Sequence, residues 1–216
     1  MTPHPWTPWR RATKRIIDLG VAAVALVVCS PILVVITAVI RLAMGSPVLY
    51  TQQRIGSLGR GFRIYKFRTM VQQPDVETTV TTADDERITS VGRFLRRTKL
   101  DELPQLWNVV RGDMSLVGPR PDVEGFADLL RGDDRLILRI RPGLTGPASI
   151  VFRYEEELLA AQNDPEEYNR SVLFPLKVRL NRAYAQHSTL VDDVRYVLWT
   201  LRPPRQATID RLMAST

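Results

Sequence analysis

The stretch from Leu19 to Ile40, LGVAAVALVVCSPILVVITAVI, contains 22 residues and no charged side chain. At about 1.5 Å per helical residue, a helix of this length reaches roughly 33 Å, enough to cross a hydrocarbon core of about 30 Å. Ser30 and Pro31 stand at its middle, and a proline inside a helix removes a backbone donor and clashes with the preceding turn. The sequence therefore predicts a membrane helix with a kink at Ser30 and Pro31.

Three kinds of segment could account for this run: a cleaved signal peptide, a spanning anchor, or a re-entrant hairpin that enters and leaves the same face. A signal peptide fits least, because its apolar region is usually about 7 to 15 residues long. Spanning helices tolerate proline, so the run alone leaves the anchor and the hairpin equally open. Basic residues flank both ends, which favours the hairpin: Arg10, Arg11, Lys14 and Arg15 before the run, and Arg41, Arg54, Arg60, Arg63, Lys66 and Arg68 after it.

The chain as a whole has an ordinary globular composition. Its 216 residues correspond to about one and a half domains at roughly 150 residues each. Hydrophobic residues at 44% and charged residues at 25% exclude wholesale disorder and a polytopic membrane bundle. One cysteine, Cys29, excludes an intramolecular disulfide and favours a reducing compartment, so any metal is expected to be a hard cation such as magnesium. The formal charge of +7 predicts a polyanionic partner: nucleic acid, nucleotide phosphates or an anionic membrane.

The remainder of the chain alternates short helical and extended patterns. The three prolines in residues 1–9 predict an irregular arm, whose Trp6 and Trp9 could rest at the lipid interface. Two β-rich runs between Val48 and Met70 flank a glycine-rich segment over 56–61, which predicts a β-hairpin because no Walker motif follows. A polar loop is expected over 72–87, and helices over 89–99, 103–110, 126–140 and near 194–201.

The helix expected over 89–99 is amphipathic and basic, which fits either an interfacial helix or a solvated face over a core. The fold class predicted is α+β: a mostly helical membrane-associated domain with a small β-hairpin and an N-terminal re-entrant helix-break-helix. We expect a basic arm over 1–15, the re-entrant hairpin over 16–44, a folded domain over 45–205 and a tail over 206–216.

Charged and rigid residues concentrate between residues 96 and 122. Asp101 and Glu102 are adjacent at an expected helix start, where acids commonly cap the helix and favour its dipole. Neighbouring cations favour the ionised form of a carboxylate, which can serve as nucleophile or magnesium ligand. The cations within one or two turns are Arg96, Arg97 and Lys99. Spacing alone leaves both the capping role and the chemical role open.

A second unusual element holds an arginine between two prolines. Pro119 and Pro121 stiffen the backbone on either side of Arg120. A rigid guanidinium can grip a diphosphate with paired hydrogen bonds, although a tight loop with a solvated arginine fits equally well in isolation. Residues 141–147, RPGLTGP, form a third rigid turn.

Five motifs occur in a fixed order along the chain: the basic arm with its apolar Ser-Pro run, KFRTM over 66–70, LDELPQLWN over 100–108, GDMSLVGPRP over 112–121 and RPGLTG over 141–146. From about Lys14 to Trp199, the chain resembles the small monotopic bacterial sugar transferases, the polyprenyl-phosphate phosphoglycosyl transferase family. Each motif is modest alone, but five in order are highly specific.

The resemblance implies an enzyme that transfers a sugar phosphate from a UDP-sugar to undecaprenyl phosphate and releases UMP. Such a reaction initiates bacterial exopolysaccharide, capsule, O-antigen or glycoprotein glycan synthesis. The implied location is the bacterial cytoplasmic membrane, with the catalytic domain on the cytoplasmic face. Inner-membrane lipid is then a partner, nucleic acid is not, and a homodimer is left open.

The resemblance also implies roles for individual residues. Asp101 would be the nucleophile that carries a covalent phosphosugar, and Glu102 its partner, with both acids candidate ligands for Mg²⁺. The substrate-binding candidates are Lys66, Arg68, Arg96, Arg120, Pro121 and Arg153. Ser30 and Pro31 would form the break of the membrane helix.

The segment after Gly146 departs from the family pattern. Many members continue with WAQVNGRN, whereas this chain has PASIVFRY over 147–154, in which only Ala148 and Arg153 match. Three glutamates follow, over 155–157. The sugar that is transferred therefore does not follow from the resemblance. Two other classes of protein are alternatives: a membrane-tethered basic scaffold without catalysis, and a spanning regulator with a cytoplasmic domain.

Overall fold

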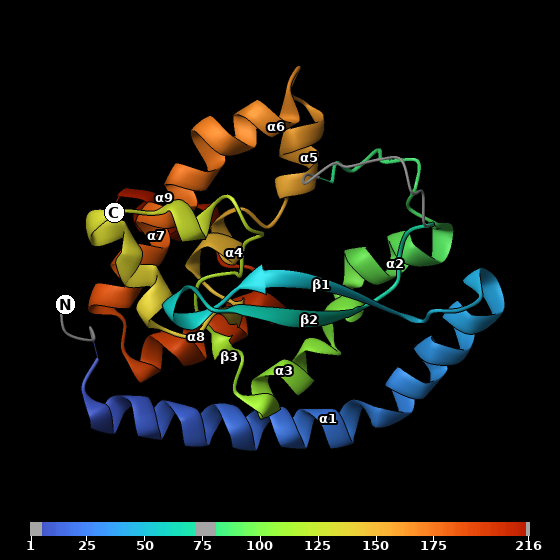
Figure 1. Ribbon diagram of the computed structural model, residues 1–216, viewed down its shortest axis with the longest axis horizontal. Helices are drawn as coiled ribbons and strands as arrows, with labels where there is room; N and C mark the ends of the chain where they lie inside the picture. The colour runs from blue at the N-terminus through green and yellow to red at the C-terminus, as the bar shows by residue number, and fades with distance from the viewer. Residues whose placement is uncertain (1–5, 72–80, 215–216) are drawn as a thin grey trace.

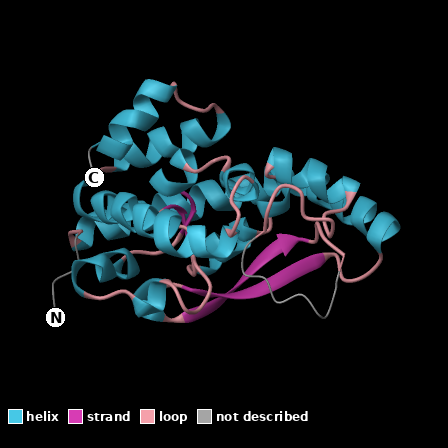
Figure 2. Ribbon diagram, turned by 90° about the horizontal axis from the view of Figure 1, so that it is seen from above, coloured by secondary structure: helices cyan, strands magenta, loops and turns pink. Residues whose placement is uncertain are grey.

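The computed structural model describes residues 6–71 and 81–214. The fold is α+β and mostly helical, with two small two-stranded sheets (Figures 1 and 2). The helices are α1 (Pro8–Met44), α2 (Ser90–Thr98), α3 (Gln105–Arg111), α4 (Pro147–Val151), α5 (Glu155–Ala160), α6 (Pro165–Tyr168), α7 (Phe174–His187), α8 (Leu190–Leu201) and α9 (Gln206–Ala214). The strands are β1 (Leu49–Ile55), β2 (Gly61–Phe67), β3 (Ser115–Val117) and β4 (Gly143–Thr145).

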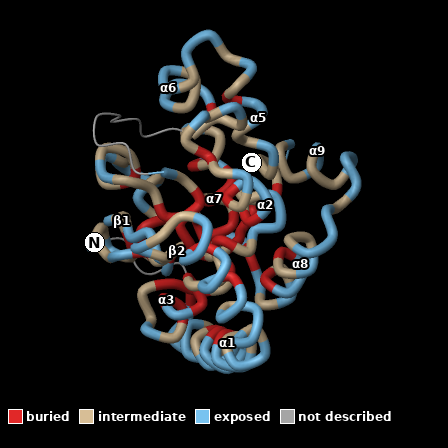
Figure 3. Tube along the Cα trace, turned by 90° about the vertical axis from the view of Figure 1, so that its right-hand side faces the viewer, coloured by how far each residue is buried: buried red, intermediate tan, exposed pale blue. Residues whose placement is uncertain are grey.

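The long helix α1 runs along one edge of the molecule, and α5 and α6 lie at the opposite edge, with the β1–β2 hairpin between them (Figure 1). Buried stretches gather in the middle, around α7 and the hairpin, while α1 turns an exposed surface outward (Figure 3). Among the described residues, α1 is the one helix long and apolar enough to cross a membrane, with a mean hydropathy of 2.8 in its most apolar window.

Helix α1 is continuous through Pro31, so the structure has a bend in place of the expected interruption. Pro31 has no N–H to donate to the carbonyl of Val27, four residues earlier. The hydroxyl of Ser30 donates to that carbonyl instead, at 2.8 Å. The helix changes direction in its second half (Figure 1). The kink predicted from the Ser-Pro pair is therefore accommodated without ending the helix.

One face of α1 packs on the rest of the protein along its whole length. In the first half, Ala22 packs in a cluster with Ile64 and Val109. In the second half, Ile36 and Ile40 pack against Phe67 of β2 and Leu95 of α2. The opposite face leaves many large apolar side chains exposed, including Val24, Val27, Val28, Val34 and Val35. This exposed apolar face is consistent with membrane association.

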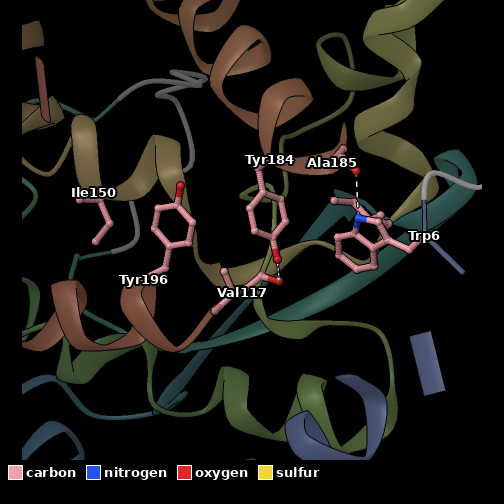
Figure 4. Close-up of a cluster of buried hydrophobic side chains, with 7 residues drawn as sticks. Trp6, Val117, Ile150, Tyr184, Ala185 and Tyr196 are labelled. Atoms are coloured by element: carbon pink, nitrogen blue, oxygen red, sulfur yellow. Dashed lines mark hydrogen bonds between the residues drawn. The ribbon is translucent and has the colours of Figure 1, made fainter. Parts of the chain in front are cut away.

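The placement of Trp6 corrects the expectation that it rests at the lipid interface. Its side chain is buried, and its indole N–H donates to the carbonyl of Ala185 at 2.9 Å. The ring also packs edge-on against Tyr184 in the cluster of Figure 4. Trp9, by contrast, is exposed. The helix already begins at Pro8, where a proline is well tolerated because the first turn needs no donor. Residues 1–5 of the expected arm lie outside the described residues.

A buried polar network fastens the start of α1 to the core. Lys14 pairs with Asp193 of α8 at 2.9 Å and with Asp18, one turn along α1, at 3.7 Å. Asp18 in turn accepts from the hydroxyl of Ser115 in β3 at 2.6 Å, and Asp193 accepts from Tyr184 at 2.5 Å. Each buried charge therefore has a partner, as burial requires.

The hairpin predicted around residues 56–61 is confirmed, since β1 and β2 pair antiparallel from Leu49 opposite Phe67 to Ile55 opposite Gly61. Strands β3 and β4 pair in parallel. Three glycines let the backbone just after β3, at Gly118, touch the backbone at both ends of β4, at Gly143 and Gly146. A Cβ at Gly143 would lie 2.1 Å from the nitrogen of Gly118, and a Cβ at Gly146 would lie 2.2 Å from the carbonyl oxygen of Gly118. These contacts fix the loop that carries Arg120.

The other expected elements meet different outcomes. The helices expected over 89–99, 103–110 and near 194–201 are confirmed as α2, α3 and part of α8. The helix expected over 126–140 is wrong: the chain forms two 3₁₀ segments, Ala127–Leu129 and Gly132–Arg139. Gly132, with a left-handed φ of 55°, stands between the first segment and the rest of the second. Residues 72–80 of the expected polar loop lie outside the described residues.

Candidate active site

The two adjacent acids lie in a tight turn between helices. Asp101 and Glu102 belong to the 3₁₀ segment Leu100–Glu102, which connects α2 to α3. Lys99 adopts a left-handed conformation with φ of 58°, so the chain reverses sharply before the acids. In the described part of the chain, the buried Oδ1 of Asp101 has no hydrogen-bond partner. Neither this segment nor α3 carries a side-chain cap, so capping by these acids is not observed, although both lie in the first turn of the 3₁₀ segment.

Glu102 joins two cations that are far from it in the sequence. The ammonium of Lys66, from β2, donates to Oε1 of Glu102 at 3.1 Å. The guanidinium of Arg120, from the loop after β3, donates to both carboxylate oxygens, with Nη1 3.3 Å from Oε2. The hairpin, the acidic turn and the Pro-Arg-Pro loop therefore converge on one carboxylate. Three of the residues singled out from the sequence are thus in direct contact.

The two acids differ in their acidity. Burial alone would raise the pKa of Glu102, but the positive charges of Arg120 and Lys66 outweigh it and hold that pKa well below its usual value. For Asp101 the direction is opposite, since burial and the negative charge of Glu102 raise its pKa. The expectation that neighbouring cations favour ionisation therefore holds for Glu102 and is corrected for Asp101.

Arg96 lies on the side of the site formed by α2. Its Nη2 is 2.5 Å from Oε1 of Glu156, in α5, and its Nη1 is 3.7 Å from the sulfur of Met70. Its charge is also one of those that act on Asp101. Arg96 is therefore within electrostatic reach of the acidic turn but is paired with a carboxylate from another helix.

Two other predicted binding residues are engaged at helix ends. Arg68 donates to the carbonyls of Met44 and Gly45, at the end of α1. Arg153 donates to the carbonyl of Thr200, at the end of α8, at 3.0 Å. Such contacts satisfy the carbonyls that a helix leaves unpaired at its C-terminus. Contact of either arginine with a substrate stays a prediction.

Pro121 is buried, and its carbonyl accepts from Arg54 of β1 at 3.4 Å. Arg54 was not among the site residues expected from the sequence, although it follows Gln52 by two positions and so shares a strand face with it. Asp122, next to Pro121, was also missed, and burial raises its pKa to about 6.

A further pair, Lys177 and Glu155, lies 2.5 Å apart between α7 and α5 and acts on Asp122 through its charges. The local sequence around Lys177 or Glu155 does not predict this contact, because it depends on how α5 and α7 pack. The site is therefore wider than the motifs indicate.

The donor set is suited to a magnesium ion only in part. Among the described residues no group of three or more His, Cys, Asp or Glu is placed to hold a metal. Mg²⁺ is commonly bound by one or two carboxylates together with substrate phosphates and waters. The unpartnered Oδ1 of Asp101, next to Glu102, fits that kind of shared site. The chain offers no closed protein cage around it within the described residues.

Comparisons with known proteins agree on one family. The family model described as bacterial sugar transferase matches residues 9–204. The exopolysaccharide production protein ExoY of Sinorhizobium fredii is 35% identical over 205 residues, covering 88% of this chain and 84% of that protein.

Two longer relatives are named for their reactions. The UDP-glucose:undecaprenyl-phosphate glucose-1-phosphate transferase of Escherichia coli K12 is 38% identical over 186 residues, covering 81% of this chain and 40% of the relative. The UDP-N-acetylgalactosamine-undecaprenyl-phosphate N-acetylgalactosaminephosphotransferase of Aeromonas hydrophila is 35% identical over 193 residues, covering 88% of this chain and 43% of the relative. The chain thus spans less than half the length of these two relatives.

Proposed function

Since this chain belongs to the bacterial sugar transferase family, we propose that it transfers a sugar phosphate from a UDP-sugar to undecaprenyl phosphate and releases UMP. Its relatives identify it as a phosphoglycosyl transferase, since two of them are named for that reaction, each with a different sugar. The observation that carries the proposal is the acidic turn itself: Asp101 presents a buried, unpartnered carboxylate oxygen beside a carboxylate held by Lys66 and Arg120. The product would initiate an exopolysaccharide, capsule, O-antigen or glycoprotein glycan.

The reaction proposed has two steps through a covalent intermediate. Oδ1 of ionised Asp101 attacks the sugar-bearing phosphorus of the donor, a P–O bond to Asp101 forms, and the bond to UMP breaks. An oxygen of the lipid phosphate then attacks the same phosphorus and releases Asp101 as a carboxylate. Lys66 and Arg120 stand where they can stabilise the charge on the phosphoryl oxygens.

We also propose that Asp101 and Glu102 hold Mg²⁺ together with the donor phosphates. When bound, the ion would offset the negative charge of the diphosphate. The support is the free oxygen of Asp101 and the placement of Glu102 beside it. Because Glu102 already pairs with Lys66 and Arg120, we expect Asp101 to provide the protein oxygen that is not yet paired.

Membrane attachment is proposed to be monotopic, with the catalytic part on the cytoplasmic face of the bacterial inner membrane. Both ends of α1 contact the same globular body: Lys14 pairs with Asp193, and Arg68 donates to Met44 and Gly45. A helix that crossed the membrane would carry one of these ends away from that body. The cytoplasmic face is also where UDP-sugars and a reducing environment, suited to one free cysteine, are found.

The test is release of UMP by the full chain in detergent, supplied with UDP-sugar, undecaprenyl phosphate and Mg²⁺. Asp101→Asn should lower turnover by at least about a hundredfold, since it removes the attacking oxyanion. It should also abolish transfer of labelled sugar phosphate onto the protein when no acceptor is present. Asp133→Asn, at an exposed carboxylate, serves as the matched control. Unchanged turnover in Asp101→Asn would reject the assigned nucleophile.

A further inference from the structure

Arg54 lies on the face of the hairpin that carries Lys66. Residues opposite each other in an antiparallel pair share a face, as do alternate residues along a strand. Tyr50 stands opposite Lys66, and Arg54 stands opposite Phe62. Arg54, four residues after Tyr50, therefore projects to the same side as the lysine that binds Glu102.

The side chain of Arg54 is anchored against the loop that carries Arg120. Its Nη2 donates to Oε1 of Gln52 at 2.6 Å, and its Nη1 donates to the carbonyl of Pro121 at 3.4 Å. The next residue, Ile55, donates its backbone N–H to the carbonyl of Asp122 at 2.8 Å. In the described part of the protein, the buried Nε of Arg54 has no hydrogen-bond partner. The guanidinium is thus fixed in place with one buried donor left over.

The charges around Arg54 do not balance. Burial lowers the pKa of Arg54, and the positive charge of Arg120 lowers it further. Glu102 is already shared by Lys66 and Arg120. Asp122, the acid that acts most on Arg54, also faces the positive charge of Lys177. Two neighbouring guanidinium groups in a partly buried site are therefore short of negative charge, which a bound anion would supply.

The contacts also give the direction in which such an anion would lie. Asp101 adjoins Glu102, Glu102 binds Arg120, and the neighbour of Arg120 accepts from Arg54. Arg54 is therefore one step further from the nucleophile than Arg120. In an in-line displacement the leaving group lies on the far side of the reacting phosphorus from the nucleophile. The phosphate next to the nucleoside, which departs with the leaving group, would therefore extend toward Arg54.

We propose that Arg54 and Arg120 together bind the diphosphate of the donor nucleotide, with Arg54 on the phosphate next to the nucleoside. The assignment rests on the proposed function and adds a substrate-binding residue to it. A pair of guanidinium groups suits two linked phosphates, because each group can donate two parallel hydrogen bonds to phosphate oxygens. The neutral partners of Arg54 hold it in place and leave its charge for the ligand.

The experiment measures binding of UDP and of UMP to the full chain in detergent by calorimetry. Arg54→Gln should weaken both by about tenfold to a hundredfold, the range expected for a lost charge-assisted contact. It should also reduce the dependence of UDP affinity on salt, which a purely structural role would not change. Arg54→Lys keeps the charge without the fork and should recover part of the affinity. If Arg54→Gln fails to fold, Arg54→Lys still shows a severalfold loss.

The matched control is Arg63→Gln, at an exposed arginine of the same hairpin on the opposite face. It should bind UDP within about twofold of the wild-type chain, as expected for an exposed charge. Wild-type affinity in Arg54→Gln overturns the assignment. So does an effect confined to the Michaelis constant for a short polyprenyl phosphate, which would place Arg54 at the acceptor. A wild-type chain that binds neither UDP nor UMP would overturn the proposed function itself.

Discussion

Asp122 is a half-buried acid whose protonated form the fold favours. Burial raises its pKa to about 6 from the ordinary 3.8, with the positive charges of Lys177 and Arg54 opposing that rise. The folded chain therefore binds this proton more tightly than the unfolded chain does. Ionising Asp122 as the pH rises through about 6 costs stability, and that stability is regained as the pH falls toward 4.

Asp122→Asn should remove this pH dependence. The variant is expected to have a higher thermal unfolding midpoint than the wild-type chain at pH 7.5, an advantage about half as large at pH 5, and nearly the same midpoint below about pH 4. Scanning fluorimetry in one detergent across this range measures the difference, with Asp133→Asn as the control at an exposed acid. A variant less stable than the wild type at pH 7.5 would mean that ionised Asp122 is a needed partner of the surrounding cations.

The two candidate catalytic acids could be predicted from the sequence, but several of the residues around them could not. Asp101, Glu102 and Arg120 stand in motifs whose order carries the resemblance, and the structure brings Arg120 onto Glu102. Arg54 could have been predicted from one pattern, the two-residue alternation of the hairpin that places it on the same face as Lys66. No sequence pattern predicts Lys177, because its approach to the site depends on the packing of α7.

Among the elements, α5 has the closest bearing on the site. It stands in the segment where the chain departs from the family pattern, and it brings Glu155 to Lys177 and Glu156 to Arg96. The backbone carbonyl of Glu156 also accepts from the N–H of Ala83 at 3.3 Å. Glu156 of α5 is thus paired with Arg96, the cation that the reaction is expected to need for binding a phosphate.

Glu156→Gln should lower the Michaelis constant for the UDP-sugar by about twofold to fivefold. The reason is competition: the substrate phosphates no longer displace a carboxylate from Arg96, and a partly exposed pair of this kind is worth up to about 1 kcal/mol. Glu157→Gln, at an exposed residue of the same helix, should leave the constant unchanged. A higher constant in Glu156→Gln would mean that Glu156 positions Arg96 for the substrate.

Elements with a local signal were predictable, and those that depend on long-range contact were not. The hairpin followed from its glycine-rich turn, and α3 from its apolar spacing and the stop at Gly112. The parallel pairing of β3 with β4 did not, although Gly118 and Gly143 are the residues that permit it. The 3₁₀ segments replaced an expected helix where Gly132 takes a left-handed conformation.

At the scale of the molecule, α1 is a support for the site as well as an apolar surface. Arg15 of α1 donates to the carbonyls of Val109 and Val110, at 2.6 and 2.9 Å, and so caps the end of α3. Helix α3 follows directly on the acidic turn. The same helix that exposes its valines therefore fixes the element next to Asp101, and so links the exposed apolar face to the position of the candidate nucleophile.

The arrangement of α1 leads to a prediction about topology. In a chain with Cys29 replaced by serine, single cysteines at Trp9 and Leu42, which are 79% and 88% exposed, should be labelled from the same side of the membrane. That side should also label Asp133→Cys, which reports the catalytic domain. A cysteine at Val28, on the exposed apolar face, should resist a membrane-impermeant maleimide because lipid covers it.

Inside-out and right-side-out vesicles separate the alternatives, because only one face is open to the reagent in each. Labelling of positions 9, 42 and 133 in inside-out vesicles alone supports the cytoplasmic, monotopic arrangement. Labelling of 9 and 42 from opposite faces would reject it in favour of a spanning helix. Since both ends of α1 are bonded to the same body, a spanning helix would also have to break either the Lys14 pair with Asp193 or the contacts of Arg68 with Met44.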